Sequence, residues 1–99
     1  MMVNQPTSLF GYQQITSLSS ATSLTVPSKD INGLVATPSL AVIRCETQGV
    51  RWRDDGVAPT ASVGMPLSVG DVLLYDGDLK KIQFIEQASS AKLDISYYR

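Results

Sequence analysis

Hydrophobic and polar residues alternate along much of this chain, and the period of two is that of a half-buried β-strand. The clearest case is the segment 40–47, where Ala41, Ile43 and Cys45 fall on one face while Arg44 falls on the other. Because the apolar positions repeat every second residue, the pattern predicts a strand whose Ala41 face is buried.

Six more segments have strand-like patterns and are separated by residues that favour turns, chiefly Gly, Asp, Asn and Ser. No convincing helical period is present. About seven short strands at this spacing are typical of an all-β fold, and we expect a small antiparallel β-sandwich of jelly-roll type. The six segments are 14–18, 23–26, 50–53, 72–75, 80–86 and 91–98.

The pair Gln48-Gly49 separates two of these segments and reads as a tight turn. The simplest prediction is a β-hairpin of residues 40–47 and 50–53, with one apolar face carrying Ile43, Cys45, Val50 and Trp52. Trp52 is therefore predicted to lie in the core, as is Phe84.

Three regions lack this alternation. Residues 1–10 are polar and contain a proline, and we interpret them as an N-terminal arm that precedes a single domain over residues 11–99. Residues 54–66 are predicted to form a loop. Residues 28–38 fit either a loop or a short extra hairpin.

Charge and composition limit the kinds of binding and catalysis that we expect of this 99-residue chain. The formal net charge is −1, which argues against binding to nucleic acid through a basic face. The chain has no histidine, the commonest general base and metal ligand. The single cysteine, Cys45, forms no internal disulfide and no thiolate zinc site, and we expect it to be a small buried hydrophobe. We therefore expect no cofactor, no metal and no enzymatic activity.

The chain contains no apolar stretch near the ~20 residues that a membrane helix needs, and we expect no membrane partner. The first ten residues have neither a basic n-region nor an apolar h-region, so they do not predict a signal peptide. Folding in a reducing cytoplasm is the corresponding expectation.

Two clusters of acidic residues have more than one interpretation. Asp54-Asp55 and Asp76-Gly77-Asp78 have the oxygen ligands that Ca²⁺ prefers. A pair of carboxylates also serves as the catalytic acid and base of glycosidases. Asp and Gly are equally the residues that β-turns prefer, and we favour turns for both clusters.

Aromatic and basic residues offer two possible recognition surfaces. Arg51 and Arg53 flank Trp52 and point away from it in a strand, and arginine is common at protein interfaces. Trp52, Tyr97 and Tyr98 are alternatively candidates for stacking on sugars, although a C-terminal tyrosine pair is more often involved in packing.

The sequence from residue 50 onward also resembles a group of small structural proteins encoded in the head-gene region of tailed bacteriophages and prophages. The resemblance covers roughly Phe10 to Tyr98, is strongest from Leu40, and is weaker over Ser28 to Pro38. The residues that carry it are Val50-Arg51-Trp52-Arg53-Asp54-Asp55-Gly56, Ala58-Pro59-Thr60, Gly64-Met65-Pro66-Leu67, Gly70, Tyr75, Gly77-Asp78-Leu79, Ile82, Phe84-Ile85 and the closing segment 91–98.

The resemblance implies a non-enzymatic virion protein, and a capsid decoration (cement) protein on the head exterior is the favoured role. Its expected partners are the major capsid protein or another virion protein, together with copies of itself as a homo-oligomer such as a trimer. The alternatives are a head–tail connector, collar or fibre-associated protein, or a carbohydrate-binding adhesion module. We expect the contacts to come from the arm and from the loop Asp54 to Leu67, with candidate interface residues Phe10, Tyr12, Arg51, Arg53, Asp54, Asp55, Pro59 and Met65.

Overall fold

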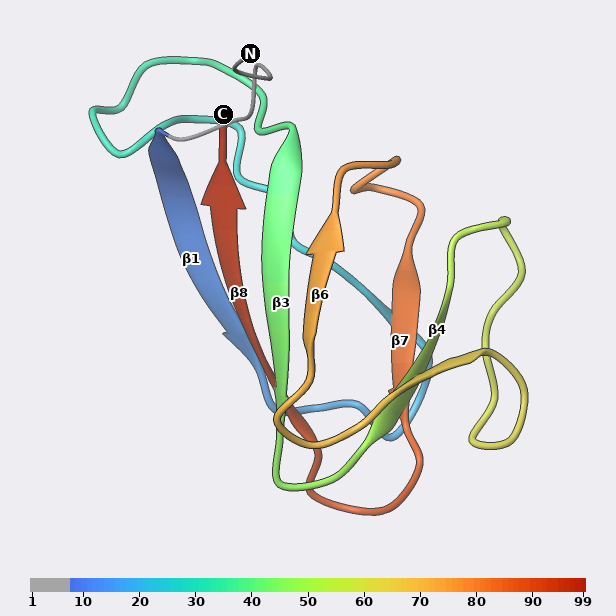
Figure 1. The fold of residues 1–99 in the computed structure, drawn as a ribbon. Helices are drawn as coiled ribbons and strands as arrows, with labels where there is room; N and C mark the ends of the chain where they lie inside the picture. The colour runs from blue at the N-terminus through green and yellow to red at the C-terminus, as the bar shows by residue number, and fades with distance from the viewer. Residues whose placement is uncertain (1–7) are drawn as a thin grey trace, which may run out of the picture.

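A computed structural model describes residues 8–99 and shows an all-β fold, with no helix in that range (Figure 1). Within these residues, eight strands make up two sheets. They are β1 (Leu9–Ile15), β2 (Thr22–Ser23), β3 (Leu40–Glu46), β4 (Val50–Arg53), β5 (Met65–Leu67), β6 (Val72–Tyr75), β7 (Gln83–Glu86) and β8 (Lys92–Tyr98).

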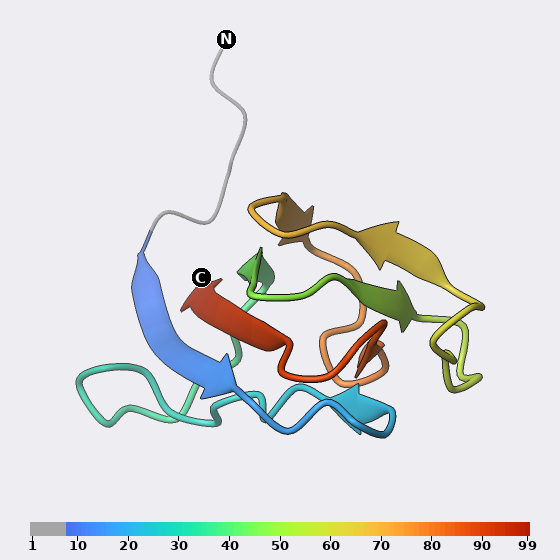
Figure 2. The same cartoon turned by 90° about the horizontal axis from the view of Figure 1, so that it is seen from below.

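Each sheet has four strands, and every strand pair is antiparallel. The first sheet has the order β1-β8-β3-β6 and the second has the order β2-β7-β4-β5. Figure 2 shows that the edge strands β5 and β6 lie on the same side of the molecule, while β1 and β2 lie on the other side.

The alternation in the sequence correctly identifies the buried face of the central strands. Leu93, Ile95 and Tyr97 of β8 are fully buried, and so are Ala41, Ile43 and Cys45 of β3. The two strands pair in register, with Ile43 opposite Ile95, so their apolar side chains enter one core together. Cys45 is buried as expected, and its burial raises the pKa of the thiol.

The predicted hairpin of residues 40–47 and 50–53 is wrong. Strand β3 belongs to the first sheet and β4 to the second, so the chain crosses between sheets within the turn that follows Glu46. Thr47 has φ 73°, and the Cys45 thiol donates to the carbonyl of Gln48 at 2.9 Å inside this crossing. Alternation shows that Cys45 and Val50 both face inward, but it does not show that they face the core from opposite walls.

The number and limits of the strands also differ from the prediction. The loop predicted over residues 54–66 contains the start of β5, a short strand that the sequence pattern missed. The strand predicted over 23–26 is shorter and starts one residue earlier, because only Thr22 and Ser23 pair with β7. Strand β1 begins at Leu9, so Leu9 and Phe10 belong to the sheet rather than to an arm, and residues 1–7 of the predicted arm lie outside the described residues.

The ambiguous segment between β2 and β3 forms a loop closed by one isolated bridge between Lys29 and Val35. The carboxylate of Asp30 accepts the N–H groups of Asn32 (2.9 Å) and Leu34 (3.0 Å), which fixes the turn. The large apolar side chains of Ile31, Leu34 and Val35 in this loop project into solvent, whereas Leu24, before the bridge, lies in the core, and Val26 and Ala36 pack against it.

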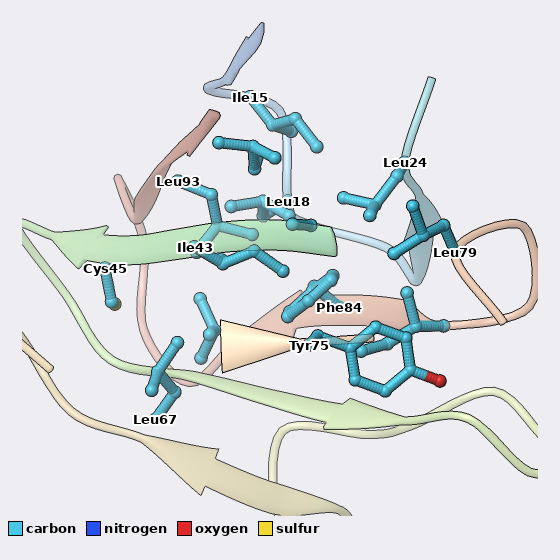
Figure 3. Packing of buried hydrophobic residues seen from close by; sticks show 14 of the residues in the cluster. Ile15, Leu18, Leu24, Ile43, Cys45, Leu67, Tyr75, Leu79, Phe84 and Leu93 are labelled. Carbon is cyan, nitrogen blue, oxygen red and sulfur yellow. The ribbon is translucent and has the colours of Figure 1, made fainter. Parts of the chain in front are cut away.

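The two sheets share a single hydrophobic core, part of which Figure 3 shows at close range. Phe84 of β7 is fully buried within it, as is Leu18 from the link between β1 and β2. The N–H of Glu86 donates to the carbonyl of Leu18 at 2.9 Å, so this link also lies against the second sheet. Trp52 is only partly buried and packs against the edge of the core.

Candidate interaction surface

The loop between β4 and β5 is a pinned structure rather than a loose connection. The side chain of Arg51 donates to the carbonyl oxygens of Ala61 (3.2 Å) and Gly64 (2.8 Å), which ties both ends of the loop tip to β4. The Thr60 hydroxyl accepts the N–H of Val63 at 3.0 Å, and the two residues also form a bridge. Pro59, within this loop, is buried.

Beside the loop is an open hollow of about 240 Å³. Its apolar wall is the half-buried ring of Trp52, which meets Tyr75 of β6 edge-on, with ring centroids 6.1 Å apart and planes at 64°. The complete lining consists of Trp52, Arg53, Asp54, Asp55, Val63, Gly64 and Met65.

The charged groups of the hollow are already engaged with partners. Arg53 Nε donates to Asp55 Oδ1 at 3.0 Å, and this interaction lowers the pKa of the Asp55 carboxyl to about 2. The Tyr75 hydroxyl donates to Asp54 Oδ2 at 2.8 Å. Burial, followed by this bond, raises the pKa of Tyr75 to about 12. The Tyr75–Asp54 bond joins the first sheet to the end of β4 in the second sheet.

The structure gathers half of the sequence-predicted interface residues at this hollow: Arg53, Asp54, Asp55 and Met65 all line it. Arg51 lies directly behind the loop and holds it in place. Two of the predicted residues are buried, namely Phe10 in the core and Pro59 within the loop. Tyr12 lies elsewhere, on the outer face of the first sheet.

The acidic clusters have the geometry of turns. Asp55 accepts the N–H of Val57 at 3.3 Å and Asp78 accepts the N–H of Lys80 at 3.0 Å, both across two residues. Within residues 8–99, no group of three His, Cys, Asp or Glu side chains is arranged to hold a metal ion.

The outer face of the first sheet is a second surface that the sequence pattern did not single out. The strand registers align Tyr12, Ser96, Val42 and Leu74 in one row across all four strands. The next row places Asp94 beside Arg44, and the Tyr12 hydroxyl and the Gln14 amide both donate to Asp94 Oδ1 at 2.9 Å. The pKa of Asp94 is lowered mainly by a side-chain hydrogen bond with the neighbouring Glu46. The two bonds from Tyr12 and Gln14 lower it further.

Strand β6 brings the apolar part of this face to the sheet edge. Val72 and Leu74 keep 53% and 67% of their surface exposed, whereas Tyr75 is buried. The sequence pattern did not identify Val72 and Leu74 as exposed, because residues 72–75 (V-L-L-Y) are apolar at every position. Such a pattern predicts that both faces of the strand are buried.

Of the three aromatic residues considered for sugar stacking, Tyr97 is fully buried, and its hydroxyl donates to Gln13 Oε1 at 2.7 Å. Trp52 and Tyr98 are half-buried.

No family model, no curated protein and no solved structure matches this chain. Among residues 8–99, no helix is long and apolar enough to cross a membrane.

Proposed function

We propose that this protein is a non-enzymatic virion structural protein that decorates a phage capsid and stabilises the shell by bridging its subunits. The sequence resemblance supplies the class of particle. The observation that supports docking is a pair of large, apolar and exposed side chains that line the hollow, namely Val63 in the loop between β4 and β5 and Met65 at the start of β5. Val57 in the same loop is also exposed. Exposed apolar side chains that cluster in this way favour a protein partner.

The rigidity of the loop supports the same role. Arg51 and Thr60 hold it in one conformation, so docking on a capsid subunit orders few additional groups and loses little conformational entropy. Two antiparallel sheets around one core, arranged as a small jelly-roll-like sandwich, provide a stiff base for such a loop.

Repetition on a symmetric shell makes modest contacts sufficient. Each copy needs only a small apolar interface with the major capsid protein if several copies engage together, because linked contacts raise the effective concentration of the next one. A head–tail connector, collar or fibre-associated role uses the same surface with a different virion partner.

The decisive experiment compares particles from the source genome with and without this coding sequence. We expect the protein in purified heads at high copy number, and we expect heads without it to release their DNA at a lower temperature. Electron cryomicroscopy then locates it on the head exterior or at the head–tail junction. Absence of the protein from purified particles would overturn the proposal.

Surface variants then test the docking loop. Adding back Val57→Glu/Met65→Glu protein is expected to leave the heads undecorated, because two charges enter the apolar contact. Leu34→Glu protein is the matched control, since Leu34 is similarly exposed but lies in the loop between β2 and β3. Equal binding by both proteins would exclude this loop as the contact.

A carbohydrate-binding module is a second candidate, favoured by the half-buried Trp52 ring beside Asp54 and Asp55 in the hollow. Titration with a glycan panel while following Trp52 fluorescence tests it. Quenching that is lost in Asp54→Asn protein would support this role, and the absence of any change would remove it.

A further inference from the structure

We propose that the protein forms a two-fold dimer in which the edge strand β6 pairs antiparallel with β6 of a second copy, so that the two first sheets become one eight-stranded sheet. The observation behind this proposal is a difference between β6 and the other sheet edges. It does not depend on the proposed function.

Three of the four edge strands carry features that discourage pairing with another chain. Strand β2 is only two residues long, and β5 contains Pro66, which has no N–H to donate. Strand β1 has a register irregularity between Leu9 and Gly11, which interrupts the regular edge that a pairing strand needs.

Strand β6 has none of these features. It contains no proline, glycine or charged residue, and its pairing with β3 runs through all four residues without a shift. Within residues 8–99, no other segment donates to or accepts from its backbone. Alternate N–H and C=O groups on its free edge therefore have no partner among the residues that the structure describes.

The side chains of β6 fit a copy of the same strand. An antiparallel pair has a two-fold axis, so each strand presents the same surface to the other. With Leu73 on the axis, Val72 of each copy lies opposite Leu74 of the other, on the outer face of the joined sheet. This register pairs the two most exposed apolar side chains of the edge and keeps the partly buried Leu73 on the core side.

A second copy is favoured over an unrelated strand because of this self-complementarity. A partner with alternating charges would place a charge opposite Val72 or Leu74, whereas β6 itself places an apolar side chain there. Two paired four-residue strands make an interface smaller than the standard ~1,200–2,000 Å². We therefore expect a weak dimer that forms at protein concentrations of roughly tens of micromolar and above.

Sedimentation equilibrium of the full chain, from about 1 to about 200 μM, tests the proposal because it covers the range of weak association. We expect the average mass to rise from 10.7 kDa towards twice that value. Val72→Glu/Leu74→Glu protein is expected to stay monomeric, since the pairing would bring four carboxylates together. Val35→Glu is the matched control, because Val35 is 83% exposed and lies in the loop between β2 and β3.

Each outcome decides the proposal. Dimerisation of the parent and of the Val35→Glu protein, with loss of dimer in the double variant, supports it. A monomeric parent at every concentration, or a dimer that survives the double variant, overturns it. Circular dichroism of the double variant checks that it remains folded, and the single Leu74→Glu variant replaces it if it does not.

Oxidative cross-linking tests the register independently. In Leu73→Cys protein the new thiol lies opposite its own copy, at a separation that an antiparallel pair and a disulfide share. We expect a covalent dimer from this variant and none from Val35→Cys protein, while Cys45 is fully buried and stays unreactive in both. Equal cross-linking by the two variants would contradict the register. Both experiments use the isolated protein, so a negative result leaves the capsid proposal to its own test.

Discussion

Phe84 and Trp52 are both aromatic residues of the second sheet, yet they differ in burial. Phe84 is fully enclosed, whereas Trp52 contacts the core with part of its ring and forms a wall of the hollow with the rest. Strand alternation gave both an inward direction, which is correct. It did not reveal that Trp52 lies where the two sheets open, because sequence position says nothing about distance from the edge of the core.

This difference predicts unequal costs of truncation. Phe84→Ala is expected to lower the free energy of unfolding by roughly 3–5 kcal/mol, since it leaves a cavity with no solvent access. Trp52→Ala is expected to cost less because solvent already reaches part of its site. Urea unfolding of both variants measures the two values, and a larger loss for Trp52→Ala would contradict this account of the core.

Tyr97 predicts how stability depends on alkaline pH. Burial raises the pKa of its hydroxyl from 10.0 to about 12, so folding favours the neutral phenol. This contribution to stability is complete below pH 10 and is lost as the pH rises from 10 to 12. We expect the free energy of unfolding to fall over this window, and to fall less in Tyr97→Phe protein, which cannot ionise there.

Denaturant unfolding at pH 8 and pH 11 supplies the comparison, with tyrosinate absorbance reporting the ionisation itself. Tyr75 has a pKa raised to about 12 as well, so the Tyr97→Phe variant retains part of the dependence. A parent protein whose stability is unchanged between the two pH values would refute the prediction.

Among the structural elements, long strands with a single buried face were the most predictable. Alternation fixed the inward side chains of β3 and β8, and turn residues fixed their approximate ends. Strand β5 was missed because Pro66 and a length of three residues leave no alternation to detect. The partner of each strand was the least predictable property, as β3 and β4 show, since pairing depends on side chains far away in the sequence.

The candidate surface was predictable in part for the same reason. Arg53, Asp54 and Asp55 are consecutive, so the sequence already placed them together beside Trp52. Met65 joined them only through the pairing of β5 with β4. Val72 and Leu74 were recognisable as exposed only once the structure showed that Leu73 and Tyr75 of β6 face the core.

Gly64 controls the shape of the loop between β4 and β5. Its φ is +141°, and a Cβ there would lie 3.1 Å from the carbonyl oxygen of Trp52. We expect Gly64→Ala to destabilise the protein by more than the ~1–2 kcal/mol of a left-handed residue alone, because the strand backbone cannot move aside. Trp52 fluorescence should change as well.

Gly70→Ala is the matched control, since Gly70 also has a positive φ of 86° but a Cβ added there would meet no atom within 4 Å. Thermal unfolding of both variants separates backbone strain from steric conflict. Equal stability losses would mean that the contact with Trp52 has no effect.

For the whole molecule, the proposed dimer predicts a dependence on salt. Asp71 and Asp76 flank β6, and antiparallel pairing brings the start of one strand beside the end of the other. With Leu73 on the axis, Asp71 of one copy lies opposite Tyr75 of the other, one residue from Asp76. Like charges therefore lie near each other at both ends of the interface and weaken it. Because ~1 M salt shortens the Debye length to about 3 Å, association should tighten as NaCl is raised from about 0.05 to 1 M.

Sedimentation at the two salt concentrations tests this, and Asp76→Asn protein is the control. It should associate more strongly than the parent at low salt and respond less to added NaCl. Association that weakens with salt would indicate an interface held by opposite charges, which the paired β6 strands do not provide.

The position of β8 has a consequence for how the chain acquires its structure. This strand is the last of the eight described strands along the chain, yet it lies between β1 and β3 and pairs with both. Until residue 98 has left the ribosome, β1 has no neighbour in the sheet, and β3 has only β6. Folding of these two sheets therefore awaits the synthesis of β8 and closes long loops late, which makes it slow for a domain of this size. During that delay the edge of β3 that later pairs with β8 has no partner. Synthesis at high protein concentration is therefore the stage at which this edge is most exposed to pairing with another chain.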